Sequence, residues 1–476
     1  MKKTLAILMM LLLLCAAAAG CAPAPQPAQP GGDAPGSQPA SESAAATEAA
    51  AVTEASAAAS EQPSAAPGAG EAGGGKTKLS FWSGIPETMG PQQAMEAYAA
   101  EHPNIEFEFV KLGWDDASNT KLDTALMSGV GVDVFTPTRA SLEKAEKGLV
   151  MDLSGMLAEN GIDLLADVGE DVLSTQHDGR YYQIPLSRLP VMWLFNKDMF
   201  DAAGIEIPTA GWTVDDLEDI ARKLTTADTY GVYLTHNWPG HWYSSLGDGY
   251  IARTEILAPD RSASNLLDPR FEYTLGKVLD MQFQDKSMLP YAEAISENYT
   301  PSSVLLTQKA AMVCASSYVV RDVKDVATFP HDFVVAFAPP PVQNKGDAIL
   351  NCWALEDPIQ VSAKTENPEE ALEFAAWLYG EGVKHFVPFG RFPAHSGISG
   401  DEVVSAFFGG ESGQLFDRES FEQVMATPVT KTPQNYGVDE ISKIITQETE
   451  PALVGEMDAA AAIRNADERV NEFLNS

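Results

Sequence analysis

The sequence has few cysteines and no arrangement of residues typical of a metal site. Only four cysteines occur in 476 residues, at positions 15, 21, 314 and 352. Such a count excludes a disulfide-rich scaffold. Cys314 and Cys352 each lie in an apolar, strand-like run, so either they pair in an oxidising compartment or they are buried thiols. His236 and His241 have no acidic or thiol ligand between them, and we expect no metal.

Positive charge is also scarce. The chain carries 31 Lys and Arg against 67 Asp and Glu, a formal net charge of −36. This balance argues against nucleic acid as a partner and against electrostatic attraction to anionic lipid. The sequence has no Gly-x-Ser-x-Gly or His-Glu-x-x-His motif. Residues 70–77 match a P-loop pattern, but they follow a Gly-rich stretch rather than a buried strand, so we expect no nucleotide cofactor.

The sequence has only a short hydrophobic run at its start. Residues 5–15 are apolar and follow Lys2 and Lys3, but they are too few to span a bilayer of about 30 Å. The small residues 18–20 precede Cys21, and this group resembles a bacterial lipobox. We therefore expect a signal peptide over residues 1–20 and a lipidated (palmitate-bearing) Cys21 at the outer face of the cell membrane. The alternative is an ordinary signal peptide cleaved near Gly20.

Residues 22–75 lack aromatic side chains, Lys and Arg, and consist almost wholly of Ala, Pro, Ser, Glu, Gly and Gln. A segment of this composition does not bury a core, so we expect residues 21–75 to form a disordered tether behind the lipidated cysteine.

Residues 76–476 alternate between strand-like and helix-like patterns, which predicts an α/β fold. This part is too long for one ordinary core. The spacing predicts strands at 79–82, 105–109 and 132–135, with helices at 91–102, 114–128 and 141–147 between or after them. Later segments predict helices at 196–204, 213–224, 367–378 and 459–474, the third capped by Asn367, and strands at 311–315 and 333–337.

An ordered set of short motifs resembles the sugar-type extracellular solute-binding proteins of ABC importers, a maltose-binding-protein-like family. The motifs lie at residues 81–84, 102–105, 126–129, 133–135, 179–185, 195–204, 211–213, 309–312, 367–371 and 393–394. They cover nearly all of residues 76–476.

The resemblance implies a two-lobed periplasmic-binding-protein fold, with each lobe a sheet flanked by helices. We expect an N-terminal lobe of residues 76–186 and 340–392 and a C-terminal lobe of residues 187–339 and 393–476. Hinge crossovers are expected near residues 185–187, 339–341 and 389–393. The resemblance further implies a monomer without a cofactor, not an enzyme, that delivers a carbohydrate to the transmembrane subunits of an ABC permease by closing around it.

A sugar site needs aromatic rings for the sugar faces and polar groups for the hydroxyls. Positions after strands and near the crossovers supply the candidates. They are Trp82, Ser83, Arg188, Trp238, Trp242, Ser316, Tyr318, Asn351, Trp353 and Arg391. Trp114, Thr136 and Thr138 are weaker candidates. Arg188 and Arg391 leave open an anionic sugar such as a uronate, since guanidinium groups suit carboxylates.

Three other functions stay open at this point. A secreted carbohydrate-active enzyme needs two carboxylates beside the scissile bond, and 67 acidic residues do not exclude such a pair. The same fold also accommodates a glycerol phosphoester, a peptide or a polyamine. A surface sensor or adhesin is the third alternative.

Overall fold

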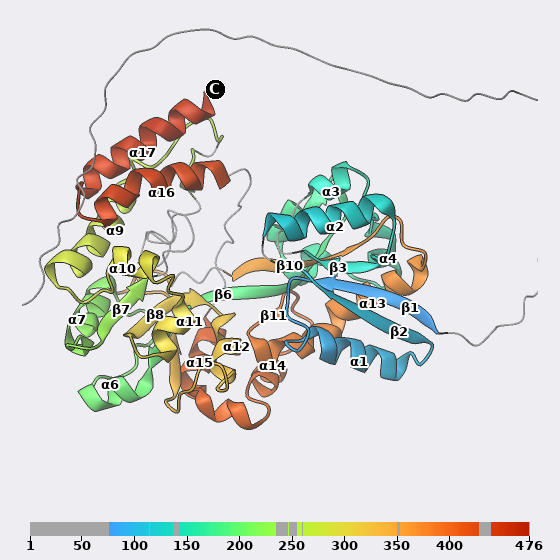
Figure 1. Cartoon of the computed structure of the whole chain (residues 1–476), viewed down its shortest axis with the longest axis horizontal. Coiled ribbons are helices and arrows are strands. Elements are labelled where there is room, and N and C mark those ends of the chain that lie inside the picture. The colour runs from blue at the N-terminus through green and yellow to red at the C-terminus, as the bar shows by residue number, and fades with distance from the viewer. Residues whose placement is uncertain are drawn as a thin grey trace, which may run out of the picture. The chain divides into compact units, whose positions relative to one another are not determined.

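Nine strands of the described residues form one mixed sheet in the computed structural model (Figure 1). The structure describes residues 76–113, 115–137, 142–234, 246, 255–258, 260–349, 353–427 and 439–475. The main path of the sheet runs β2 (Ile105–Lys111), β1 (Thr77–Ser83), β3 (Val134–Thr136), β10 (Trp353–Val361), β6 (Ile184–Asn196), β8 (Ala310–Ser316) and β7 (Tyr230–Leu234). The strands β9 (Val335–Ala338) and β11 (Phe392–Pro393) also pair with β6, and β4 (Gln176–His177) and β5 (Arg180–Tyr181) form a separate small hairpin.

Helices cover the sheet. They are α1 (Pro91–Glu101), α2 (Asp116–Ser128), α3 (Glu143–Glu146), α4 (Ser154–Glu159), α5 (Leu164–Val168), α6 (Lys197–Ala203), α7 (Val214–Leu224), α9 (Pro269–Leu279), α10 (Tyr291–Ser296), α11 (Pro301–Leu306), α12 (Val319–Lys324), α13 (Pro368–Gly380), α14 (Gly400–Phe407), α15 (Arg418–Ala426), α16 (Asp439–Leu453) and α17 (Ala459–Leu474). Short 3-10 helices are η1 (Glu170–Thr175), η5 (Gly382–Phe389) and η6 (Glu411–Leu415), and a π-helical turn, η4 (Asp280–Gln284), extends α9.

The first part of the sheet is parallel. β1 pairs with β2 along its whole length and with β3 at its carboxyl end. Helices α1 and α2 supply the connections that parallel strands need. Gly129 ends α2 in the left-handed conformation, with φ 74°. The carboxyl ends of β1, β2 and β3 therefore lie at one edge, where Ser83, Lys111 and Thr136 end their strands.

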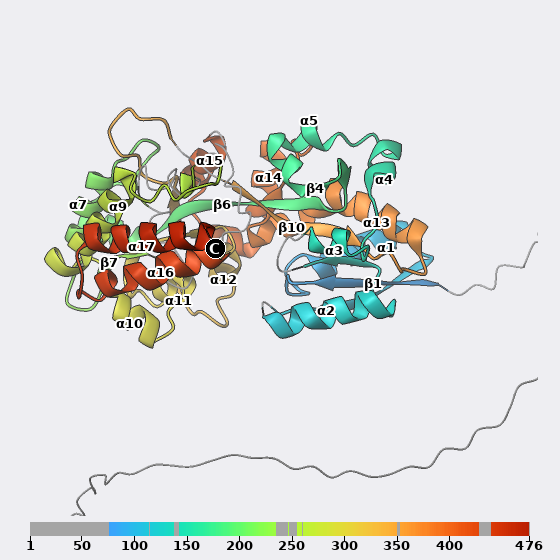
Figure 2. The same ribbon diagram turned by 90° about the horizontal axis from the view of Figure 1, so that it is seen from above.

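The 13-residue strand β6 takes part in two sets of pairings (Figures 1 and 2). Its first half pairs antiparallel with β10 and β11, at residues 184–190. Its second half pairs antiparallel with β8 and β9, at residues 191–196. The continuous strand β6 thus joins the β1–β2–β3–β10 part of the sheet to the β8–β7 part.

Two large hydrophobic clusters lie against the sheet. One cluster includes Phe81, Tyr98 and Phe374, where α1 and α13 pack beside β1 and β10, and it continues to Val313 of β8 and Phe337 of β9. The other includes Trp193, Trp212 and Ile445, and it lies beneath α7, α9 and the pair α16–α17, which run side by side in both views. Each of these buried side chains favours folding because apolar surface leaves water.

The predicted α/β class and two-lobed fold are confirmed, and most predicted elements lie within two residues of their expected ends. Thr213 forms the expected capping box with Asp216: the Asp216 amide donates to Oγ1 at 3.1 Å, and the Thr213 amide donates to Oδ2 at 2.9 Å. Asn367 is the N-cap residue of α13, as predicted, but its side chain makes no capping hydrogen bond. The Asn367 amide group instead donates to the Lys78 carbonyl at 3.2 Å, so it ties the start of α13 to β1.

Candidate functional site

Side chains from three separate chain segments meet in a buried polar cluster on the first half of β6. Ser187 Oγ, on β6, donates to Asp357 Oδ2, on β10, at 2.6 Å. Arg391 Nε, just before β11, donates to the same oxygen at 2.9 Å. The Arg391 and Asp357 side chains are only 2% and 8% exposed. This cluster fastens β10 and the residue before β11 to the part of β6 that pairs with those two strands.

Asp357 adopts a backbone conformation that strands rarely contain. Its φ is 52°, in the left-handed region, between Glu356 and Pro358, which keep their pairings with Ser187 and Pro185 on β6. Asp tolerates this region better than bulky residues do, although the conformation is still unfavourable. The two hydrogen bonds to its carboxylate hold the residue in place.

Arg188, an expected ligand residue, has contacts within the protein. Its guanidinium donates to the Val168 carbonyl at 2.6 Å, to the Ala394 carbonyl at 3.3 Å and to Asp171 Oδ2 at 3.4 Å. The residue is 8% exposed, and burial lowers the pKa of the guanidinium. These contacts tie Val168, Asp171 and Ala394, the residue after β11, to β6. We therefore leave Arg188 out of the proposed ligand set.

Trp82 and Ser83 are also buried. The Trp82 indole N–H lies 2.7 Å from both Ser80 Oγ and the Gly131 carbonyl, and the ring packs in a third, smaller hydrophobic cluster. Ser83 is fully buried and shares a 2.6 Å hydrogen bond with Thr136. In the described structure, these three side chains at the carboxyl ends of β1 and β3 bond to one another, to Ser80 or to backbone.

Ser316 and Tyr318 lie in the short segment from the end of β8 to the start of α12, and both are half-buried. The Arg321 guanidinium lies 5.3 Å from the centre of the Tyr318 ring. Burial raises the pKa of Tyr318 further above its ordinary value of 10, and the hydroxyl is a protonated donor at neutral pH. Between them, fully buried Ser317 donates through Oγ to the Gly390 carbonyl. This bond holds the segment against the turn that precedes Arg391.

Several expected site residues lie outside the described residues. They are Trp238, Trp242, Asn351 and the weaker candidates Trp114 and Thr138, together with Cys21 and Cys352. Trp353 begins β10 opposite Pro190, and only its backbone is described. Trp193, on β6, is fully buried.

Two cations near these residues were not predicted. Lys111 is the exposed last residue of β2, and its ammonium donates to the Gly84 carbonyl and, at 2.7 Å, to the Leu112 carbonyl. Arg321 lies on α12, where its Nε donates to Asp322 Oδ1 at 3.2 Å. The position of Lys111 at a strand end was visible in the sequence, but the adjacency of α12 to the turn at Gly390 was not.

Neither a metal centre nor a membrane-spanning helix emerges from the part of the chain that the structure describes. Its His, Cys, Asp and Glu side chains form no group that would hold a metal ion. Its helices are all too short or too polar to cross a bilayer.

Comparison with known proteins identifies a family. The model of the bacterial extracellular solute-binding proteins matches residues 86–385. A chain of Brucella abortus named as a binding protein is 23% identical over 299 residues, which cover 60% of this chain and 68% of that one.

Solved structures with the same fold come from several bacteria. An ABC substrate-binding protein of Listeria monocytogenes, in complex with cycloalternan, superposes with a TM-score of 0.66 at 20% identity, covering 84% of this chain and 99% of that one. UgpB of Mycobacterium tuberculosis, in complex with glycerophosphocholine, superposes with a TM-score of 0.65 at 16% identity, with the same coverage. At these identities, the likeness establishes the fold.

Proposed function

Since this chain belongs to the bacterial extracellular solute-binding proteins, we propose that it captures a sugar or oligosaccharide between two lobes and delivers it to an ABC permease by domain closure. The protein is then a binding subunit that returns its ligand unchanged, and it is not an enzyme. The family is of the ABC transporter type, and the structures with the same fold include a complex with a carbohydrate, cycloalternan.

The observation that carries this proposal is the double pairing of β6. A hinge-bending protein needs two parts that each keep their own strand pairs while a few connecting residues absorb the rotation. β6 keeps one set of partners over residues 184–190 and another over residues 191–196. We propose lobes of residues 76–186 with 340–392 and of residues 187–339 with 393–476, in which residues 187–190 connect the two lobes while they keep their pairs on β10.

The proposed ligand set combines polar groups from β8 and α12 with aromatic rings. Ser316 and Tyr318 are half-buried, so each still has surface for a ligand. Trp238, Trp242, Asn351 and Trp353 complete the set as proposals that come from the sequence. Tryptophan rings stack on the C–H faces of a sugar, while hydroxyl and amide groups bond its edges.

The proposed location is the outer face of the cell membrane, with Cys21 lipidated and residues 22–75 acting as the tether. Such an anchor keeps the binding protein near its permease while the tether lets residues 76–476 move. The protein is proposed to work as a monomer.

A thermal-shift screen tests the function. Protein carrying Cys21→Ser, which prevents lipidation, is heated with mono-, di- and oligosaccharides, including uronates, and with glycerol phosphoesters. A ligand at 100 times its Kd stabilises the folded state by about 2.7 kcal/mol, which raises Tm by roughly a few degrees. The proposal predicts a selective shift with a sugar that is recovered intact.

Two outcomes would overturn the proposed sugar-binding function. Conversion of the sugar during the assay would identify a carbohydrate-active enzyme. Shifts confined to glycerol phosphoesters would assign the fold to a different ligand, as in the glycerophosphocholine complex of UgpB.

A further inference from the structure

Three cations gather around the turn at Gly390, in a chain whose net charge is −36. Lys111 ends β2, Arg321 lies on α12, and Arg391 follows Gly390 directly. They come from three segments that are far apart in the sequence. We call Lys111, Arg321 and Arg391 the cation cluster.

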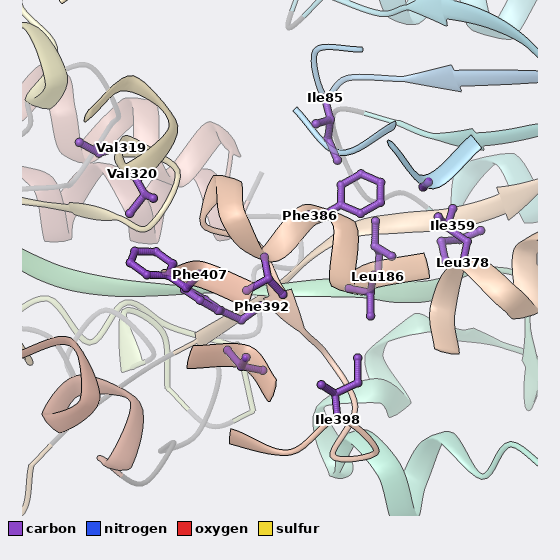
Figure 3. Packing of buried hydrophobic residues seen from close by; sticks show 14 of the residues in the cluster. Ile85, Leu186, Val319, Val320, Ile359, Leu378, Phe386, Phe392, Ile398 and Phe407 are labelled. Atoms are coloured by element: carbon purple, nitrogen blue, oxygen red, sulfur yellow. The ribbon is translucent and has the colours of Figure 1, made fainter. Parts of the chain in front are cut away.

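Contacts around Gly390 bring Arg391 and α12 together. Gly390 has φ 80° and accepts a hydrogen bond from Ser317 Oγ. A Cβ on Gly390 would overlap the Ser317 carbonyl oxygen and would lie 3.3 Å from Cβ of Val320, the residue before Arg321. Figure 3 shows Val319 and Val320 of α12 near Phe392 and Phe407, close to the strand that carries Leu186.

Lys111, the third member of the cation cluster, lies at the end of β2 near the same turn. The Lys111 ammonium is held by the carbonyls of Gly84 and Leu112. The next residue, Ile85, packs in the same hydrophobic cluster as Phe386 of η5, and Figure 3 shows the two side chains next to one another. Phe386 is four residues before Gly390, so the loop after β1 and the Gly390 turn lie close together.

The charges act on one another. Lys111 as a whole is exposed, but its ammonium is partly buried against the two carbonyls. Its pKa is lowered first by this burial and then by the positive charges of Arg321 and Arg391. Like charges held together are unfavourable, and an anion placed among them relieves the repulsion.

The cluster keeps hydrogen-bond donors that the described residues do not use. Buried Nη1 of Arg391 has no partner among the described residues, although Nε is bonded to Asp357. Arg321 uses Nε for Asp322, and the guanidinium has five N–H donors in all. The carboxylates of Asp357 and Asp322 thus balance only two of the three positive charges in the cation cluster. An oxyanion is the group that satisfies such donors best, because charge-assisted hydrogen bonds are the strong ones.

We propose that the cation cluster binds an anionic group, a carboxylate or a phosphate, carried by the sugar ligand. Tyr318 lies against Arg321 and the Ser316 hydroxyl is two residues away in sequence, so the sugar hydroxyls and the anion are bound side by side. This inference rests on the proposed function, since it names the class of sugar that the protein takes. The ligand is an acidic sugar: a uronate or a sugar phosphate.

Calorimetric titration of the Cys21→Ser protein tests the inference. The ligands are glucuronate, galacturonate and its oligomers, glucose 6-phosphate and glycerol 3-phosphate, matched with glucose, galactose and maltose. The variants are Lys111→Gln, Arg321→Gln and Arg321→Lys, and circular dichroism checks that each folds. Lys443→Gln, on α16 with its side chain 61% exposed, is the matched control.

We expect an acidic ligand to bind more tightly than its neutral counterpart. Arg321→Gln or Lys111→Gln weakens the binding of that ligand by about tenfold to a hundredfold, Arg321→Lys weakens it less, and Lys443→Gln leaves it unchanged. The carboxylate and phosphate arms tell which anion is bound.

The contrary results differ for the two proposals. Tight binding of a neutral sugar that is insensitive to Lys111→Gln and Arg321→Gln would overturn the cation-cluster inference and leave the sugar-binding function standing. Binding of glycerol 3-phosphate alone would overturn the sugar ligand. Failure of every ligand to bind would overturn both.

Discussion

Arg391 and Asp357 form a buried ion pair that joins the residue before β11 to β10. Nε and Oδ2 are 2.9 Å apart, and Ser187 of β6 donates to the same oxygen at 2.6 Å. The pair lies beside Ser187, in the part of β6 that pairs with β10 and β11 and next to the proposed lobe boundary. Its members therefore fix the geometry of the connections between the two proposed lobes.

Removing the negative charge of this pair should strongly destabilise the protein. Asp357→Asn keeps the size of the side chain and tolerates the positive φ, but it leaves the Arg391 charge buried without compensation. Breaking one side of a buried pair costs about 3–5 kcal/mol. Urea unfolding measures the loss, and Asp163→Asn, at an exposed helix cap, is the control, with an expected cost of about 1 kcal/mol or less.

The double variant Asp357→Asn/Arg391→Met separates charge pairing from packing. Because both charges are then gone, the loss of unfolding free energy should be smaller than the sum of the two single losses. Strict additivity would show that the two side chains do not act as a pair.

Gly390 should tolerate no side chain. Its φ of 80° is unfavourable for alanine, and a Cβ would overlap the Ser317 carbonyl oxygen. Gly179 has a φ of 72° but nothing within 4 Å of its Cβ position. We expect Gly179→Ala to lower the free energy of unfolding by about 1–2 kcal/mol, the cost of the left-handed conformation alone. Gly390→Ala should lower it by clearly more, and equal losses would mean that the turn simply shifts away.

Lys324 makes the stability depend on pH. Its ammonium lies 4.9 Å from the centre of the Phe407 ring and donates to the Phe407 carbonyl at 2.9 Å. Burial lowers its pKa from 10.5 to about 8. Between pH 8 and 10.5 the unfolded chain binds more protons at this site, so the contribution of Lys324 to stability rises with pH there. Below pH 8 the full cost of burying the charge is present.

Lys324→Met should therefore raise Tm at pH 7. Lowering the pKa of Lys324 from 10.5 to about 8 corresponds to a burial cost of about 3 kcal/mol at most. Lys324→Met removes this cost, but the lost ring and carbonyl contacts offset part of the gain. A net gain of about 1 kcal/mol is expected. Thermal scans at pH 7, 8.5 and 10 check the sign, because the gain over wild type must shrink as pH rises. A gain that grows with pH would contradict this explanation.

Substitution of Tyr318 should change ligand affinity, whereas substitution of Trp82 should change stability. Tyr318→Ala should weaken ligand binding by roughly tenfold or more, since it removes a ring and a hydroxyl from the proposed site. Trp82→Phe should leave the Kd unchanged but destabilise the fold by about 1–3 kcal/mol, because the hydrogen bonds of the indole N–H are lost. Calorimetry and urea unfolding on both variants measure the two effects. A large change of Kd for Trp82→Phe would restore that residue to the ligand set.

Local patterns predicted most of the fold because helix and strand signals are local. The spacing of Thr213 and Asp216 predicts the start of α7, and the predicted helix at 459–474 matches the bounds of α17. Asn367 shows the limit of such signals, because its side chain bonds to β1, 289 residues away in sequence. A cap prediction rests on neighbouring residues, so it does not foresee a hydrogen-bond acceptor that is distant in sequence, such as the Lys78 carbonyl.

The candidate site was harder to predict because burial depends on tertiary contacts. Trp82 and Arg188 sit at the ends or bends of strands, where ligand residues often occur, but their polar atoms are used by Gly131, Val168 and Ala394. Asp357 carried no sequence signal at all, since its importance comes from two partners on other segments.

Small-angle X-ray scattering of the Cys21→Ser protein, with and without a saturating sugar from the thermal-shift screen, tests domain closure most directly. Capture between two hinged lobes predicts a smaller radius of gyration with ligand, reversed on dialysis, with the sugar recovered unchanged. An unchanged radius at full saturation would contradict domain closure, and a converted sugar would contradict the assignment as a binding protein.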